Sequence, residues 1–189
     1  EEIEDDRIIL TAKSATSHCL LKIVLKEGYG ASPHYYVRHI VPQNPVPKDA
    51  AGSLFIGDDA LWLYHHRREN LHYYDLGEEW HKLTGLGMVY SLWTANRTFA
   101  RESPEKLQLV YDRLIKGMEE GVANKYATIE SVREEKDFTF QQLEDYLQVI
   151  RWDLKDKHLE GLELFYKKAH ALNLINHVPK LSFADVKRR

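Results

Sequence analysis

Residues 55–86 constrain the fold of this chain most strongly, because two strand-to-helix turns follow one another there within a short stretch. In the first turn, the apolar pair Phe55–Ile56 stops at Gly57, a residue that lets a ligand approach the backbone closely. Asp58–Asp59 then stand where a helix would begin, and carboxylates there complement the helix dipole and its free N–H groups. On local grounds alone, a tight turn and a capped helix explain the same residues.

The second turn repeats this arrangement a few residues later. Tyr73–Leu76 is predicted to be a strand, Gly77 follows it, and Glu78–Trp80 is predicted to open a helix. Open α/β sheets bind their ligands where strands end and helices begin. Residues 55–86 therefore predict one wall of a ligand site in an α/β protein.

The first half of the chain predicts further strands and one more helix. Arg7–Ala12 and Tyr35–Val41 are strand candidates, and Ser14–Glu27 has the apolar spacing of an amphipathic helix. Pro42–Gly52 contains three prolines and is predicted to be a loop. Met88–Ala95 is a nearly continuous apolar run, as expected of a strand that is buried on both faces.

The second half is helical in character. Ser103–Glu105 is a helix start with a capping serine and a proline in the first turn. Further helices are predicted over Thr139–Gln148 and from Asp156 to about Asn173, with a short strand over Val149–Leu154 between them. These changes divide the chain into a central α/β lobe, residues 1–92, and a helical part of another lobe, residues 93–189.

The apolar faces of these helices need a partner that the sequence does not provide. Only the two strand candidates Met88–Ala95 and Val149–Leu154 could cover them, and each buried Leu or Phe contributes about 1.5–3 kcal/mol. We therefore expect an incomplete sheet beneath these helices. Its missing strands would come from chain ahead of Glu1 or from another copy, as a homo-oligomer or by strand exchange. A helical subdomain that packs on itself is the alternative.

Composition limits the classes of partner. The formal net charge of −3 and the lack of a basic stripe argue against a nucleic-acid partner. No apolar run approaches the roughly 20 residues that span a bilayer, and the acidic start, residues 1–6, is unlike a secretory signal. Cys19 is the single cysteine, so no disulfide can form within the chain. We expect a cytoplasmic protein that needs neither membrane nor nucleic acid.

Several reactive or aromatic residues have simpler explanations than catalysis. The neighbouring histidines lack the spacing of a metal site and are interpreted as solvent-facing. Arg67–Arg68 is interpreted as a solvated surface, and Cys19 as a packing residue without a nearby base. The tryptophans are predicted to anchor the core. The histidines are His65, His66, His72 and His81, and the tryptophans are Trp62, Trp80, Trp93 and Trp152.

Four segments together resemble the chorismate dehydratase family of the futalosine route to menaquinone. They are TAKSATSHCLLKIVL (Thr11–Leu25), FIGDDAL (Phe55–Leu61), YDLGEEWHKLTGL (Tyr74–Leu86) and IRWDLKDKHLEGLELFYKKAHAL (Ile150–Leu172). The resemblance implies a two-lobed fold like that of type II periplasmic binding proteins. It also implies that chorismate loses water to give 3-[(1-carboxyvinyl)oxy]benzoate, without a metal or an organic cofactor.

The resemblance also implies that the N-terminal segment of the family is missing here. Family members begin with roughly another third of sequence, which holds the first strands of the other lobe. This expectation matches the incomplete sheet inferred from the apolar helix faces. Site residues that the family takes from that segment have no counterpart in this chain, so whether this chain alone is active stays open.

Chorismate carries two carboxylates, which helix N-termini and hydroxyl groups can bind without a cluster of cations. Ser14, Thr16 and Ser17 follow the strand Arg7–Ala12 and open a helix, so their hydroxyl and N–H groups can converge on one carboxylate. Ordinary N-capping is the alternative role of these residues.

Ile56, Gly57 and Asp58 complete the predicted substrate-binding set, and Asp58 is the candidate catalytic residue. A sister enzyme of the same pathway, which acts on a futalosine-derived substrate, has a histidine base where Gly57 stands, so the glycine favours the dehydratase. Since aromatisation drives the reaction, a substrate carboxylate could itself accept the proton. A binding protein of the same fold for small anions or other solutes, without catalysis, is the alternative from another functional class.

Overall fold

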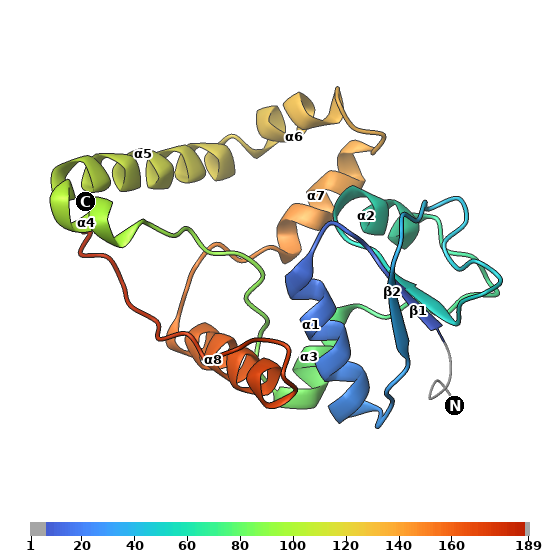
Figure 1. Ribbon diagram of the computed structural model, residues 1–189. Helices are drawn as coiled ribbons and strands as arrows, with labels where there is room; N and C mark the ends of the chain where they lie inside the picture. Colours follow the sequence, from blue (N-terminus) through green and yellow to red (C-terminus); the bar gives the residue numbers. More distant parts are fainter. Residues whose placement is uncertain (1–6, 188–189) are drawn as a thin grey trace. The chain divides into compact units, whose positions relative to one another are not determined.

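The computed structural model describes residues 7–187, which form two compact units (Figure 1). Residues 7–90 and 154–179 make unit 1, and residues 91–153 and 180–187 make unit 2. The acidic stretch at residues 1–6 lies outside the described residues, as do residues 188–189.

Unit 1 contains a three-stranded parallel sheet with the order β2-β1-β3. The strands are β1 Arg7–Leu10, β2 His34–Val37 and β3 Gly52–Leu54. Ile8, Ile9 and Leu10 are all buried, as expected of a central parallel strand that is covered on both faces. The α/β class predicted from the sequence is therefore confirmed.

Unit 1 also contains four helices. They are α1 Ala15–Ile23, which continues as the π-helical turn η1 Val24–Gly28, α2 Gly57–His65, α3 Leu76–Thr84 and α8 Asp156–Ala171. Their starts agree with the helix starts predicted from sequence to within a few residues. The loop predicted over Pro42–Gly52 is confirmed up to Ala51, after which β3 begins.

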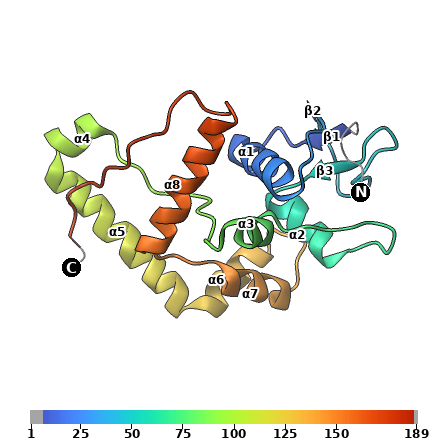
Figure 2. The same cartoon turned by 90° about the horizontal axis from the view of Figure 1, so that it is seen from below.

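Helix α1 lies between the sheet and α8 (Figures 1 and 2). On one side, Leu21 packs against the sheet residues Ile8 and Leu10. On the other side, Ile23 belongs to a buried cluster that joins α1, α3 and α8. The cluster contains Leu20, Ile23, Val24, Trp80, Phe165 and Ala169. This core fixes the direction of α1, and so the position of its first turn.

Unit 2 is helical throughout its regular part. Its helices are α4 Arg97–Glu102, α5 Pro104–Ala123, α6 Lys125–Arg133 and α7 Phe140–Val149. Thr139 caps α7 in a reciprocal capping box with Gln142. Helices α5 and α7 were predicted, whereas α4 and α6 were not.

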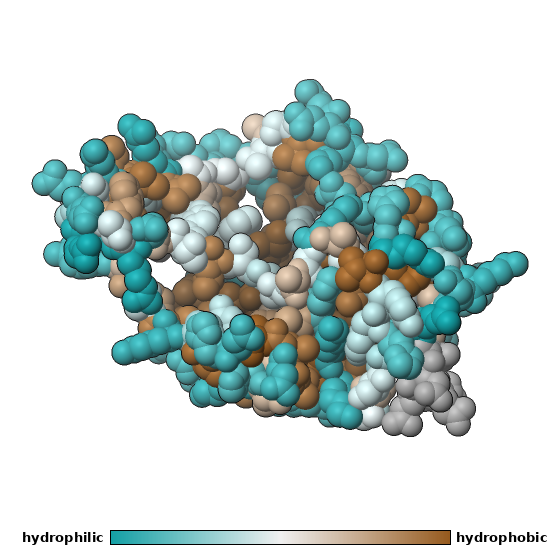
Figure 3. All heavy atoms as spheres, viewed as in Figure 1, coloured by the Kyte–Doolittle hydropathy of each residue, from teal (hydrophilic) through white to brown (hydrophobic). Residues whose placement is uncertain are grey.

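The helices of unit 2 bury little apolar surface. None of the residues of α5 is buried, and Leu109, Val110 and Leu114 are all exposed. Figure 3 shows apolar residues at the surface in the region of α4 and α5. Among residues 91–153 and 180–187 there is no strand that could cover this face.

Three predicted strands are wrong. Residues 73–75 form no strand, because Asp75 caps α3 and accepts hydrogen bonds from the N–H groups of Gly77 and Glu78. The segments 88–95 and 150–154 have no regular structure, and residues 91–95 are exposed. A strand needs a hydrogen-bonding neighbour, and the described part of the chain offers these segments none.

The prediction that the tryptophans anchor the core holds only in part. Trp80 is 0% exposed and packs edge to face on Phe165, with the ring centroids 6.1 Å apart. Trp93 and Trp152, however, are 60% and 56% exposed. Both lie in irregular segments, and their hydrophobicity alone does not bury them.

The chain leaves unit 1 after Tyr90, close to the boundary expected between residues 92 and 93, and α8 returns to unit 1. The lobes predicted over residues 1–92 and 93–189 stay a prediction, since they refer to a larger two-lobed protein.

Candidate functional site

The candidate site lies at the carboxyl edge of the sheet in unit 1. Strands β1 and β3 are parallel neighbours, with Leu10 paired to Leu54 at their carboxyl ends. The segments that follow the two strands therefore leave the sheet side by side. Helix α1 begins at Ala15 and α2 at Gly57, so two helix starts stand at one edge.

The turn between β1 and α1 is held by its own side chains. The hydroxyl of the buried Thr11 accepts a hydrogen bond from the Lys13 N–H at 3.2 Å. Ser14 caps α1, since its Oγ accepts from the Ser17 N–H at 3.1 Å and lies 2.9 Å from the Ser17 Oγ. One turn into the helix, the His18 Nε2 lies 2.6 Å from the Thr11 carbonyl oxygen, which accepts a hydrogen bond from the tautomer that carries its hydrogen on Nε2. The turn is thus closed from both sides.

The first turn of α1 still has free donors. Ser14 and Ser17 are occupied with each other, as in ordinary N-capping. Thr16 is exposed, and its hydroxyl has no hydrogen-bond partner within residues 7–187. The N–H groups of Ala15 and Thr16 belong to the first turn of the helix, where no intrahelical acceptor exists. These donors can bind an anion.

The start of α2 is built differently. Ile56 stands at the cap position with extended backbone angles and makes no side-chain capping bond. Gly57 has a φ of +60°, which only glycine adopts without steric cost, and a Cβ there would meet nothing within 4 Å. Asp58 and Asp59 occupy the first turn. The open space beside Gly57 leaves its backbone accessible.

A salt bridge joins the two helix starts. The Lys13 Nζ lies 2.6 Å from the Asp59 Oδ2, and the two side chains are 61% and 32% exposed. No sequence motif indicates this pair, although Lys13 is the one basic residue in the turn between β1 and α1. The bridge links residues that are 46 positions apart, and only the pairing of β1 with β3 brings them together.

The structure thus brings the predicted site residues to one edge of one sheet. Ser14, Thr16 and Ser17 lie directly after Lys13, and Ile56–Asp58 lie directly before Asp59. Two neighbouring helix starts, the free donors of the α1 start and one ammonium group form a place where an anion with two charges can be held. The role of each residue in binding or catalysis stays a prediction.

Cys19 has a packing role, and the histidines form no metal site within the described residues. Burial raises the pKa of the Cys19 thiol, an effect that the nearby Lys22 only partly opposes, and Cys19 packs against the core cluster. The packing role predicted for Cys19 is therefore confirmed. Within residues 7–187, no three His, Cys, Asp or Glu side chains come together in a way that could hold a metal ion.

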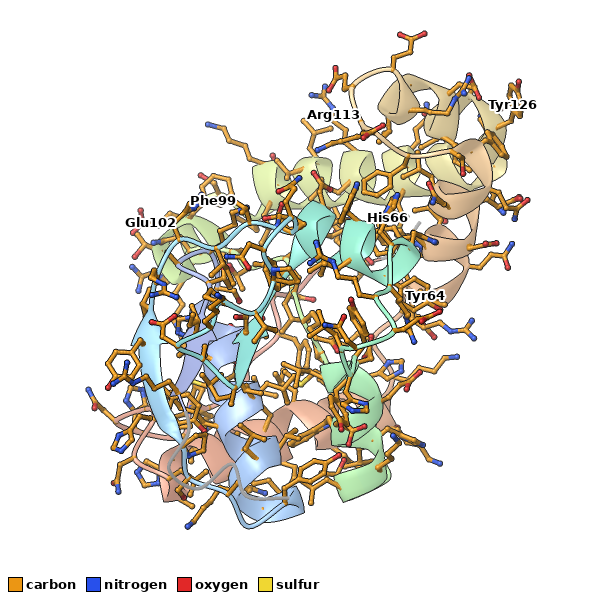
Figure 4. The ribbon with its side chains drawn as sticks, turned by 90° about the vertical axis from the view of Figure 1, so that its right-hand side faces the viewer. Tyr64, His66, Phe99, Glu102, Arg113 and Tyr126 are labelled. Atoms are coloured by element: carbon orange, nitrogen blue, oxygen red, sulfur yellow. The ribbon has the colours of Figure 1, made fainter. Side chains whose placement is uncertain are left out.

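The end of α2 is an aromatic and basic surface. Tyr64 and His66 both lie there (Figure 4). The His66 ring stacks on Trp62 with centroids 4.0 Å apart. The Arg67 guanidinium lies 4.7 Å from the Tyr64 ring centroid and 5.4 Å from that of Tyr73. These contacts attach residues 67–73 to α2, so Arg67 has a structural role in addition to its exposure.

A buried carboxylate lies near the opposite end of α1. Glu79 is 7% exposed and accepts hydrogen bonds from the Tyr29 hydroxyl at 2.6 Å and the Lys82 Nζ at 2.7 Å. The hydrogen bond from Lys82, and after it the bond from Tyr29, lower the pKa of the Glu79 carboxyl, although burial acts to raise it. Because η1 and α3 meet here, we assign Glu79 to packing of the two elements rather than to the candidate site.

No helix within residues 7–187 is both long enough and apolar enough to cross a membrane.

Comparison with known proteins gives two results. The sequence model of a family described as "Menaquinone biosynthesis" matches residues 1–171. A curated relative from Thermus thermophilus, named chorismate dehydratase, is 30% identical over 182 residues. The match covers 89% of this chain and 63% of the relative, so the chain spans less than two thirds of the length of that protein.

Proposed function

This chain belongs to the menaquinone biosynthesis family, and we propose from this that it dehydrates chorismate to 3-[(1-carboxyvinyl)oxy]benzoate in the futalosine route. The relative named chorismate dehydratase supports the reaction, and the residues at the carboxyl edge of the sheet support the substrate. The family assignment covers most of the chain, whereas the reaction itself is our proposal for this protein. We further propose that it acts in the cytoplasm.

One observation carries the proposal: the starts of α1 and α2 stand side by side and are joined by the Lys13–Asp59 bridge. Chorismate has one carboxylate on its ring and one on its enolpyruvyl side chain. A site for it must hold two negative charges at a fixed spacing. Two helix starts at one sheet edge meet that requirement, since the dipole of each helix is positive at its start and the start of α1 adds free donors.

We assign one carboxylate of the substrate to the start of α1. The N–H groups of Ala15 and Thr16 and the Thr16 hydroxyl would donate to it, while Ser14 and Ser17 keep the turn in shape. The second helix start, Ile56–Asp58, would lie against the rest of the substrate. Gly57 fits this role because its missing side chain leaves the backbone open to close contact.

The elimination itself needs little from the protein. The C3–H and C4–O bonds of the substrate break, and the ring becomes aromatic as hydroxide leaves with the proton as water. Asp58 is the protein group that we propose to orient the leaving hydroxyl or to take part in the proton transfer. A substrate carboxylate that accepts the proton would make a strong protein base unnecessary, and the site residues would then act mainly by holding the substrate in one conformation.

The fold that we propose for the complete protein is two-lobed and like that of type II periplasmic binding proteins. In that arrangement unit 1 supplies one wall of the site. The exposed apolar face of α5 would be covered by strands that another segment or another copy of the chain contributes. Size-exclusion chromatography with light scattering tests the second source: a concentration-dependent dimer supports it, and a monomer at all concentrations contradicts it.

Incubation of the purified protein with chorismate tests the reaction. We expect loss of the diene absorbance, growth of an aromatic absorbance, and a product mass lower than that of chorismate by one water. Binding without a product would contradict the dehydratase and support a non-catalytic binding protein. Absence of both binding and product would contradict any role in which this chain alone recognises chorismate.

A further inference from the structure

We infer that Lys13 determines the specificity of the site for a dianion, and that Asp59 holds the Lys13 ammonium until an anionic ligand takes it over. The inference rests on the proposed position of the site between α1 and α2.

The charges at the two helix starts explain why a cation is needed there. Asp58 and Asp59 both lie in the first turn of α2, where they stabilise the helix through its dipole. The same two carboxylates repel an approaching dianion. The Lys13 ammonium lies 2.6 Å from Asp59 and offsets one of these charges. Without Lys13, the Asp59 charge would be unopposed at this edge and would repel an approaching dianion.

The surroundings of Lys13 suit an exchange between two partners. Its backbone is fixed, because the Lys13 N–H donates to the Thr11 hydroxyl. Its side chain is mostly exposed, so the ammonium keeps donor positions open beside Asp59. A lysine side chain is flexible and can turn its ammonium from one carboxylate to another. An exposed ion pair stabilises a fold by only about 0–1 kcal/mol, so a ligand carboxylate can compete with Asp59.

A second exposed ion pair of unit 1 gives a matched control. Arg38 donates two hydrogen bonds to Asp49, at 3.0 and 3.1 Å, and both side chains are about half exposed. Asp49 lies before β3 and senses the charge of Arg7 at the amino end of β1, whereas the site lies at the carboxyl ends of these strands. Asp49→Asn therefore removes a carboxylate that lies outside the two helix starts and serves as the control for the loss of one negative charge.

The test measures binding by isothermal titration calorimetry with two dianions, chorismate and benzene-1,3-dicarboxylate, and with the neutral benzene-1,3-dicarboxamide. We expect Lys13→Gln to raise the Kd of both dianions by roughly tenfold, the effect of losing one charge-assisted hydrogen bond. Lys13→Arg should restore most of the affinity. Asp59→Asn should lower the Kd by roughly two- to fivefold, since it releases the ammonium. Asp49→Asn should leave it unchanged.

Each outcome decides between the two proposals. An unchanged Kd in Lys13→Gln overturns the inference and leaves the dehydratase proposal standing. If Asp59→Asn weakens binding as much as Lys13→Gln, the bridge is structural and the inference is also wrong. Binding of the benzene dicarboxylate but not of chorismate, with the same dependence on Lys13, supports the inference and contradicts chorismate as substrate. If the unaltered protein binds neither dianion, the inference is wrong. The turnover assay then tests the dehydratase reaction independently.

Discussion

The backbone of Gly161 in α8 lies directly against the carbonyl group of Gly87, so closely that a side chain at position 161 would overlap with that oxygen. This contact brings the irregular segment after α3 onto α8 and closes the core of unit 1 around Trp80. The position of α8, and through it that of α1, depends on the absence of a side chain at residue 161.

We therefore expect Gly161→Ala to destabilise the protein by about 1–3 kcal/mol, because a methyl group is forced into a filled space. The change should appear as a lower thermal midpoint by circular dichroism. Gly117, in the middle of α5, is the control, because a Cβ there meets nothing within 4 Å. Gly117→Ala should leave the midpoint unchanged or raise it, and equal losses in both variants would contradict the packing explanation.

Two different reasons could require a glycine at position 57: its backbone conformation, or close contact between its backbone and a ligand. Since its φ is +60°, Gly57→Ala should cost about 1–2 kcal/mol of stability, whereas Gly57→Asn should cost less because asparagine tolerates that conformation. Urea unfolding measures both. If the substrate contacts the Gly57 backbone, the Asn variant should fold normally and yet bind chorismate more weakly. Normal binding by this variant would assign the glycine to backbone geometry alone.

The buried Glu79 predicts a pH dependence of stability. Its pKa is lowered in the folded protein by hydrogen bonds from Lys82 and Tyr29, below the value of about 4.3 expected for an unfolded chain. Its stabilising contribution is therefore fully present above the unfolded pKa and is lost as the pH falls through the folded pKa. Glu79→Gln should lower the free energy of unfolding at neutral pH and reduce its fall in acid.

The hydrogen bond between Tyr29 and Glu79 raises the pKa of Tyr29, whereas it lowers that of Glu79. Chiefly because its hydroxyl donates to Glu79, the pKa of Tyr29 is raised to about 12. This contribution is complete below the unfolded pKa and is lost only as the pH rises through about 12. Tyr29→Phe should thus keep most of the acid dependence, since the bond from Lys82 to Glu79 remains. An acid dependence unchanged in Glu79→Gln would show that other carboxylates cause it.

The Asp58→Asn variant, in which an amide replaces the carboxylate, tests whether Asp58 takes part in the reaction. If Asp58 takes part in the elimination, Asp58→Asn should lower kcat by about 10²-fold or more, the usual effect of losing a general acid or base. Asparagine has almost the size and shape of aspartate and removes only the charge that complements the dipole of α2, worth about 0.3–1 kcal/mol, so folding should be preserved. Asp49→Asn serves as a control with the same chemical change outside the site. A kcat close to normal in Asp58→Asn would remove Asp58 from the chemistry and favour a substrate carboxylate as the proton acceptor.

Local sequence signals predicted those parts of the fold that local interactions determine. The start of α5 follows from its first-turn proline. The helices predicted from Ser14, Glu78 and Thr139 also form, as α1, α3 and α7, although Asp75, which caps α3, was predicted to lie in a strand. The apolar run at Arg7–Ala12 likewise predicts β1 because a central parallel strand is buried on both faces.

The failures come from long-range interactions. Apolar composition at residues 88–95 suggested a strand, but a strand forms only beside another, and the described residues provide no neighbour for this segment. The Lys13–Asp59 bridge depends on the pairing of β1 with β3, which no motif near either residue indicates. The burial of Glu79 also was not predicted, since an acidic pair at a helix start is usually solvated.

The central claim is that two neighbouring helix starts in unit 1 together hold the dianion. It is tested most directly by titrating the 15N-labelled protein with chorismate and following the backbone amides by NMR. The account predicts that the largest shifts fall in two separate stretches, residues 13–17 and 56–59, with the same saturation curve. Shifts confined to one stretch, or concentrated elsewhere in the protein, would contradict it.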